Sequence, residues 1–170
     1  LHMTQSTHNK QYFLGVIIFL LLCQPLSSFT GRYPIQNFTP AEYKAGIQNI
    51  DFAQNRDMTL FVANNLSVLS FNGDEWDQKN LQTGKKKRSL CFDENTNRLY
   101  VGSQGEFGYF EEDWNFVSLS NMIPEHAKDF DEVWDVFIIN SHVYFCTFQG
   151  IYVYDGEKVA VINQDAKLGR

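Results

Sequence analysis

A short run of apolar and aromatic residues recurs three times along the chain, and this recurrence constrains the fold more than any other feature. The copies begin at Leu60, Leu99 and Val143, which are 39 and 44 residues apart. Each copy is preceded by one apolar run and followed by two more, and polar turns separate these runs. Four short strands in a unit of about 40–45 residues are typical of a β-propeller blade.

The repeats predict an all-β fold, a partial β-propeller of about three four-stranded antiparallel blades. Aromatic residues make up 15% of the chain, which favours strands, and no stretch holds the 3.6-residue apolar period of a helix. We expect blades over residues 47–84, 85–130 (with a connecting loop) and 131–170, after an extended lead-in over 30–46. A closed ring needs about four to eight blades, so we expect further blades from the same, longer chain.

The first 29 residues differ in composition from the repeats. Phe13–Cys23 is an uninterrupted run of eleven apolar residues after a polar start. This length fits the hydrophobic segment of a signal peptide and falls short of the roughly 20 residues that span a membrane. Residues 1–29 therefore predict a signal peptide and an exported chain. Cys91 and Cys146 lie inside strand-like runs, where we expect buried thiols rather than a disulfide scaffold.

Charge and glycine spacing argue against nucleic-acid and nucleotide binding. The formal net charge is −6, which is unfavourable for binding of nucleic acid by this segment. The basic run Lys85–Arg88 is interpreted as a solvated loop between strands. Gly102, Gly105 and Gly108 have the spacing GxxGxxG with no helix after them, which indicates a strand turn rather than a phosphate-binding loop.

We expect no catalytic residue, no metal site and no cofactor, and hence no enzyme activity in this segment. His126 and His142 have no neighbouring ligands at metal-site spacing. Asp93–Asn97 starts like a calcium loop, but the positions that need glycine and a bidentate glutamate are Arg98 and Gln104. A cation held by the acidic residues before Val133 is a minor alternative. No serine lies in a GxSxG elbow.

Three stretches of the chain resemble a known family. They are Asn37–Trp76, with the motif NFTPAEYKAGIQNIDFAQ, Leu99–Asp113, LYVGSQGEFGYFEED, and Val133–Gly156, VWDVFIINSHVYFCTFQGIYVYDG. Together they look like the first three blades of the two-component-regulator propeller proteins typical of Bacteroidetes. The sequence departs from the family pattern at Asn49–Ile50, where Asn-Trp is common, and at Leu66–Ser67, where Gly-Leu is common.

The resemblance implies a function in signalling. In that family the propeller is an extracytoplasmic sensor, at the periplasmic face of a bacterial inner membrane. A triple-tyrosine domain often follows, then a hybrid kinase or a helix-turn-helix output, and the full-length form is expected to be a homodimer. The ligand implied for this chain is extracellular, and an oligosaccharide is one candidate. The alternatives are a secreted propeller enzyme acting on polysaccharide, as a lyase or glycosidase, and a structural interaction propeller.

The loops that join second to third strands predict where a ligand binds, because in a blade these loops all leave at one rim. Each carries a side-chain amide, which can both donate to and accept from a sugar hydroxyl, and one carries an aromatic ring. The candidate ligand-binding residues are Asn64, Asn65, Gln104, Phe148 and Gln149. The alternative is that these amides satisfy the backbone of their own turns.

Overall fold

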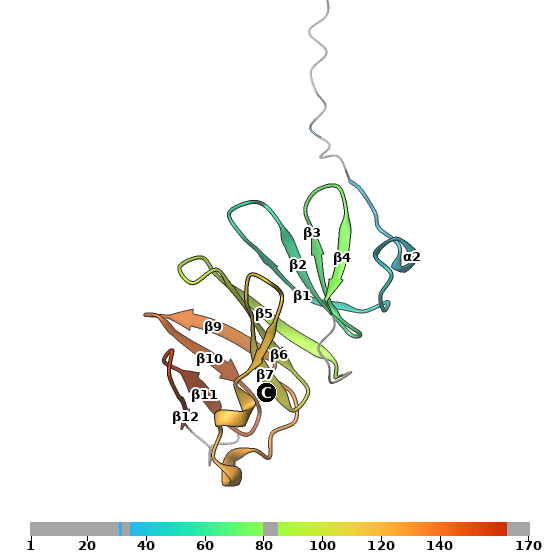
Figure 1. Ribbon diagram of the computed structural model, residues 1–170. Helices are drawn as coiled ribbons and strands as arrows, with labels where there is room; N and C mark the ends of the chain where they lie inside the picture. The colour runs from blue at the N-terminus through green and yellow to red at the C-terminus, as the bar shows by residue number, and fades with distance from the viewer. Residues whose placement is uncertain (1–30, 32–34, 80–84, 163–170) are drawn as a thin grey trace, which may run out of the picture. The chain divides into compact units, whose positions relative to one another are not determined.

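The computed structural model describes residues 31, 35–79 and 85–162. The chain divides into two compact units, 1–37 and 38–170, and all the helices and strands given below belong to the second unit (Figure 1). The predicted signal peptide over residues 1–29 lies outside the described residues. In the described part of the chain no helix is both long and apolar enough to cross a membrane.

The described residues form three four-stranded antiparallel sheets, and within each sheet the spatial order of the strands follows the chain order. The first sheet, blade 1, comprises β1 (Asn49–Gln54), β2 (Leu60–Asn64), β3 (Val68–Phe71) and β4 (Trp76–Lys79). Blade 2 comprises β5 (Lys87–Asp93), β6 (Arg98–Ser103), β7 (Glu106–Phe110) and β8 (Phe116–Ser118). Blade 3 comprises β9 (Asp135–Ile139), β10 (His142–Cys146), β11 (Ile151–Tyr154) and β12 (Val159–Ile162).

Helical structure within the described ranges is limited to three short elements. These are the helix α2 (Pro40–Tyr43) and the 3-10 turns η1 (Ser120–Met122) and η2 (Glu125–Ala127). Thr39 and Glu42 form a capping box at the start of α2, in which the backbone N–H of Thr39 donates to Glu42 Oε2 at 2.6 Å. The prediction of an all-β, partial β-propeller of three four-stranded blades is therefore confirmed.

The first strands of neighbouring blades lie side by side, as the strands nearest the axis of a propeller do. The carboxylate of Asp51 on β1 accepts a hydrogen bond from the backbone N–H of Leu90 on β5, at 2.7 Å. The hydroxyl of Ser89 on β5 donates to the carbonyl of Val133, just before β9, at 3.0 Å. These polar contacts tie each blade to the next one along the chain.

The first strands of blades 1 and 2 each contain a β-bulge at the same place in the repeat. In β1 the pairing with β2 is interrupted between Asn49 and Asp51, and in β5 the pairing with β6 is interrupted between Lys87 and Ser89. A bulge leaves one residue out of the ladder and re-aims its side chain. That residue is Arg88 in blade 2, and the corresponding place in blade 3, immediately before β9, is taken by Trp134.

The core consists of aromatic and aliphatic side chains packed between the blades. Between blades 2 and 3, the ring of Phe107 stacks on that of Phe145 with a centroid separation of 4.3 Å. Between blades 1 and 2, Phe61 packs with Leu90 and Leu99. On the other side of blade 1, a third group covers Val62 and Leu69; it comprises Phe38, Tyr43, Ala45, Leu60 and Trp76.

Candidate functional site

The loops that join second to third strands gather at one rim, together with the segments that lead into β5 and β9. The backbone N–H of Gln104, in the β6–β7 loop, donates to the carbonyl of Lys86 at 3.0 Å. The next residue, Gly105, donates its N–H to the carbonyl of Asp131. The β6–β7 loop is therefore fastened both to the segment before β5 and to the segment before β9.

Four side chains from blades 2 and 3 form a contiguous group at this rim, and we call Arg88, Glu132, Trp134 and Phe148 the rim cluster. Arg88 Nη2 lies 2.6 Å from Glu132 Oε1, and the two side chains are 20% and 10% exposed. The guanidinium of Arg88 also stands 5.0 Å from the centre of the Trp134 ring. The ring of Phe148 lies 5.2 Å from that of Trp134.

The rim cluster combines a fixed charged pair with open aromatic surface. Trp134 is 44% exposed and Phe148 is 40% exposed, although both are large apolar side chains that a folded protein ordinarily buries. The Arg88 guanidinium is planar and is held on one side by a carboxylate and on another by an aromatic face, so its position is well defined. Exposed aromatic rings beside fixed polar groups can contact a ligand through both apolar and polar surface.

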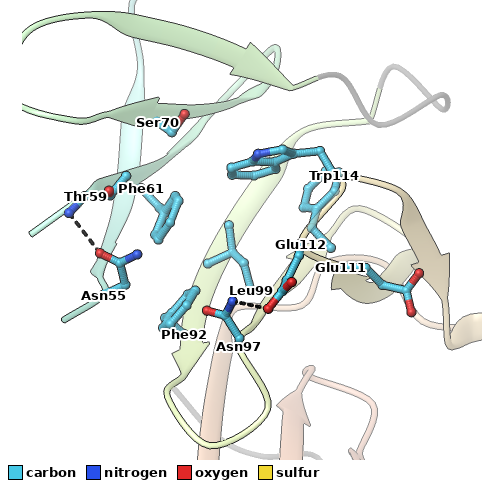
Figure 2. A pocket seen from close by; sticks show the side chains of 11 residues that line it. Asn55, Thr59, Phe61, Ser70, Phe92, Asn97, Leu99, Glu111, Glu112 and Trp114 are labelled. Carbon is cyan, nitrogen blue, oxygen red and sulfur yellow. Dashed lines mark hydrogen bonds between the residues drawn. The ribbon is translucent and has the colours of Figure 1, made fainter. Parts of the chain in front are cut away.

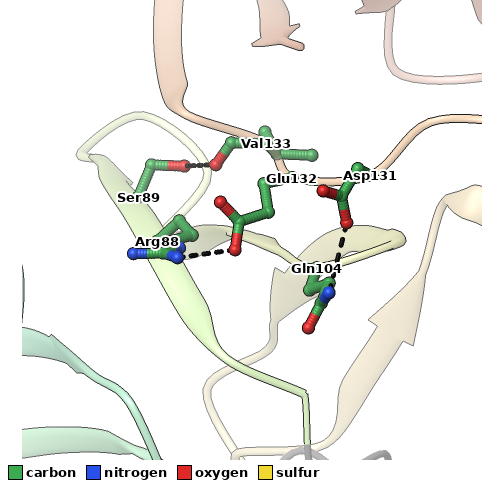
Figure 3. A network of polar contacts seen from close by, with 6 residues as sticks. All are labelled: Arg88, Ser89, Gln104, Asp131, Glu132 and Val133. Atoms are coloured by element: carbon green, nitrogen blue, oxygen red, sulfur yellow. Dashed lines mark hydrogen bonds and ion pairs between the residues drawn. The ribbon is translucent and has the colours of Figure 1, made fainter. Parts of the chain in front are cut away.

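A second polar pair extends the rim cluster along the β6–β7 loop. Figure 3 shows that Asp131, Glu132 and Val133, which are consecutive, contact three different positions of blade 2. Gln104 Nε2 donates to Asp131 Oδ1 at 3.2 Å, and both side chains are exposed. The Gln104 amide oxygen and the second Asp131 oxygen therefore remain able to accept hydrogen bonds from a ligand.

The structure distributes the five predicted ligand-binding residues unevenly around this rim. Gln104 and Phe148 adjoin the rim cluster, as described above. Gln149 is exposed in the β10–β11 loop, where its backbone N–H donates to Thr147 Oγ1 at 3.2 Å. Asn65 is half-buried in the β2–β3 loop of blade 1, and its backbone N–H donates to the carbonyl of Gln48 at 3.0 Å.

Asn64 is fully buried, and its amide is used to hold the β2–β3 loop together. The side-chain oxygen accepts hydrogen bonds from the backbone N–H groups of Gly46 and Leu66, at 2.9 and 3.0 Å. The side-chain nitrogen donates to the carbonyl of Gly46 and to Asn49 Oδ1, at 2.6 and 2.7 Å. All the capacity of this amide is therefore taken up within blade 1, as the turn-backbone interpretation expects.

The interpretation of Lys85–Arg88 as a solvated loop is wrong for its second half, because β5 begins at Lys87. The Lys87 side chain is fully buried between blades 1 and 2, and its ammonium group donates to the carbonyl of Leu66 at 2.7 Å. Burial lowers the pKa of Lys87 below its usual range, since the charged form loses its hydration. The Arg88 side chain points to the other side of the strand, where it forms part of the rim cluster.

Sequence reasoning missed Arg88 and Trp134 as site residues. The available signal was their place in the repeat, since each stands one position before the regular inner strand of its blade. Alignment of the three repeats places Arg88 and Trp134 at the same position. The bulge that re-aims the side chain at this position appears only in the structure.

The first strands also carry acidic residues at equivalent places, Asp51 in β1 and Asp135 in β9. Burial raises the pKa of Asp135, and the nearby charge of Asp51 adds to this effect. Burial likewise raises the pKa of the thiols of Cys91 and Cys146, neither of which forms a disulfide. Within the described ranges, no group of three or more His, Cys, Asp or Glu side chains is arranged to hold a metal ion.

No protein-family model matches this sequence, and no curated protein matches it. Solved structures do match its fold. A protein described as the extracellular domain of a hybrid two-component system from B. thetaiotaomicron has a TM-score of 0.57 at 11% identity, over 82% of this chain and 20% of that chain. A domain described as that of a one-component system from the same organism has a TM-score of 0.51 at 16% identity, over 69% and 17%.

A third match is YCF48 from Cyanidioschyzon merolae, with a TM-score of 0.55 at 14% identity, over 74% of this chain and 43% of that chain. The likeness is one of fold. At these identities the three matches support the propeller architecture, and two of them are extracellular domains of signalling systems by description. The chain spans less than half the length of each of these structures.

Proposed function

We propose that this chain belongs to an extracytoplasmic ligand-sensing propeller of a bacterial transmembrane signalling protein or transcriptional regulator. The observation that carries the proposal is the rim cluster, where exposed Trp134 and Phe148 rings flank the Arg88–Glu132 pair at the junction of blades 2 and 3. Support also comes from the shared fold with two extracellular domains described as parts of signalling systems. Further blades of the same chain would complete the propeller.

The chemistry of the rim cluster suits an oligosaccharide. A sugar ring has an apolar C–H face that can stack on an aromatic side chain, and hydroxyl groups that need both donors and acceptors. Trp134 and Phe148 would supply the stacking surface. Gln104 and Asp131 would supply hydrogen-bond acceptors, and the guanidinium of Arg88 would supply donors.

The position of the cluster suggests how binding would be transmitted. Arg88 and Gln104 belong to blade 2, whereas Trp134 and Phe148 belong to blade 3. A ligand that contacts both blades favours the arrangement of blades in which all these contacts are made, and it shifts the population toward that arrangement. The resulting change would then pass through the remaining blades to the membrane and the output domain.

One face of blade 3 carries exposed apolar side chains, and this observation supports the presence of further blades. Phe137, Ile139 and Ile162 are all about half exposed on β9 and β12, and apolar residues on both faces of a sheet are typical of sheets covered on both sides. We propose that the following blade of the longer chain covers this face.

The test is ligand binding to the full-length sensor, screened with a panel of oligosaccharides by isothermal titration calorimetry. Trp134→Ala and the double variant Gln104→Ala with Gln149→Ala should each weaken binding at least about tenfold, equivalent to about 1.4 kcal/mol. The matched controls are Met122→Ala, a similarly exposed apolar side chain, and Gln54→Ala, an exposed amide at the opposite end of blade 1. Unchanged affinity in both rim variants would contradict the proposal, and hydrolysis or elimination of the oligosaccharide would favour the enzyme alternative.

A further inference from the structure

A cleft of about 490 Å³ lies between blades 1 and 2, at the rim opposite the rim cluster. Three hairpin turns contribute residues to its lining: those that join β1 to β2, β5 to β6 and β7 to β8. These turns link first to second or third to fourth strands, so they leave the antiparallel blades at the other end from the loops of the proposed sensing site. None of the residues that line the cleft belongs to the rim cluster.

The wall of the cleft is aromatic. Figure 2 shows Phe61, Phe92 and Trp114 turned toward one another across the space between the two blades. The ring of Phe61 stacks on Phe92 at 5.4 Å and meets the ring of Trp114 edge-on at 5.8 Å. Phe92 and Trp114 are half-buried, and both keep accessible surface on the cleft.

The charge at the mouth of the cleft is negative. Among the described residues that line it, the ionisable side chains are Glu111 and Glu112, both from the β7–β8 turn. Glu112 Oε1 accepts a hydrogen bond from Asn97 Nδ2 at 2.6 Å, which holds this carboxylate over the opening, as Figure 2 shows. A neighbouring hollow of about 340 Å³ continues along the same two glutamates and adds Asp113 and Arg98.

Trp114 is the fourth residue of the five-residue turn between β7 and β8. Trp114 has φ = +62°, a conformation that is unfavourable for a bulky L-residue. The β1–β2 turn, Asn55–Thr59, has the same length and the same backbone hydrogen bonds, and Met58 takes the corresponding positive φ of +65°. The positive φ therefore belongs to this five-residue turn, and it sets the direction in which the Trp114 side chain leaves the backbone.

Two further polar side chains line the cleft, Ser70 and Asn55. The side-chain oxygen of Asn55 accepts a hydrogen bond from the backbone N–H of Thr59 at 2.9 Å. The Ser70 hydroxyl and the Asn55 amide nitrogen are groups that can donate to a polar part of a ligand.

We propose that this cleft binds an organic ammonium ion, a compact cation with an apolar body. Aromatic rings attract a cation through their negative faces, most strongly when the rings are partly desolvated, and the carboxylate of Glu112 balances its charge. Trp114 already attracts one ammonium group, since Lys79 Nζ stands 5.2 Å from the centre of its ring while it is paired with Asp77. The site is independent of the proposed sensing site at the other rim.

The experiment uses choline and tetramethylammonium as probes on the full-length protein, with 3,3-dimethyl-1-butanol as the neutral isostere of choline. Binding is followed by calorimetry and by tryptophan fluorescence at constant ionic strength. We expect both cations to bind and the neutral isostere to bind at least about tenfold more weakly. Equal binding of choline and its isostere, binding of a neutral methyl glycoside in preference to both cations, or no binding of any probe would overturn the proposal.

The variants assign the site and separate it from the rim cluster. Trp114→Asn removes the indole while supplying a residue that tolerates positive φ, and it should weaken choline binding at least about tenfold; Trp114→Tyr should retain most of it. Glu112→Gln should weaken binding of the cation and not of the isostere, whereas Glu75→Gln, in the exposed β3–β4 turn, should change nothing. Trp134→Ala should leave choline binding intact, and a loss there instead of in Trp114→Asn would place the site at the rim cluster and refute this assignment.

Discussion

The substitution Phe107→Ala tests whether the aromatic core is what joins blade 2 to blade 3. Phe107 lies on β7 and is fully buried. Its ring contacts three others: Phe145 on β10 at 4.3 Å, Tyr152 on β11 at 5.3 Å, and Phe130, in the segment before β9, at 5.6 Å. All three partners lie beyond blade 2, so this one side chain carries much of the packing between the two blades.

The expected loss is about 4–5 kcal/mol in the free energy of unfolding. Truncation of a buried phenylalanine costs roughly 3–5 kcal/mol, because transfer free energy is lost and a cavity remains. Each aromatic pair adds about 0.5–1.5 kcal/mol beyond its buried area, which places this site in the upper part of that range. Because domains are stable by only about 5–15 kcal/mol, the variant should be near the limit of folding.

Urea denaturation of the full-length protein measures the loss. Amide hydrogen exchange assigns it to a blade, because the strands β5 to β8 and β9 to β12 are followed separately. Phe107→Leu should cost roughly 1–2 kcal/mol, since most of the apolar volume is kept, and Met122→Ala, at an exposed position, should cost less than about 0.5 kcal/mol. A loss below about 1.5 kcal/mol in Phe107→Ala, or lost protection in blade 2 alone, would refute the reasoning.

Three further predictions concern contacts in and between blades 1 and 2. Asp51→Asn should destabilise the protein by about 1–3 kcal/mol in urea denaturation, because Asp51 accepts from two backbone N–H groups and an amide offers only one oxygen; an unchanged midpoint would contradict this. Lys87, whose pKa burial lowers, binds fewer protons in the folded than in the unfolded state, so stability should rise with pH up to about 10.4. Lys87→Met should remove that rise, and parallel pH profiles of the two proteins would show that Lys87 does not cause it. Gly108→Ala should cost about 1–3 kcal/mol, because a Cβ there would overlap the carbonyl of Val117, whereas Gly31→Ala, which has open space, should be neutral.

The sequence by itself determined the local structure of this protein. Short apolar runs such as Leu60–Ala63 and Leu99–Gly102 need no distant partner to be recognised as strands, because they are rich in β-branched and aromatic residues and are bounded by polar turns. Polar turns between the runs make the pairing local and antiparallel. The number of strands per blade and the order of strands in each sheet followed from these two features.

The tertiary structure decided what the polar and aromatic side chains do. The sequence predicts both Asn64 and Gln104 in loops that join second to third strands. In the structure Asn64 ends β2 with its amide buried in blade 1, whereas Gln104 lies in the β6–β7 loop with its amide exposed beside Asp131. Lys87 and Arg88 are adjacent in the sequence, and a single bulge sends one into the core and the other to the rim cluster. Register at a bulge depends on how two strands meet, which a single run of residues does not specify.

The same holds for the cleft between blades 1 and 2. Phe61, Phe92 and Trp114 come from two different sheets, and their separation along the chain gives no sign that they share one wall. The positive φ of Trp114 belongs to its five-residue turn, as at Met58 in the β1–β2 turn, and no preference of tryptophan itself predicts it. Strand identity is local in this fold because it depends on neighbouring residues, whereas both candidate sites arise where separate blades come together in space.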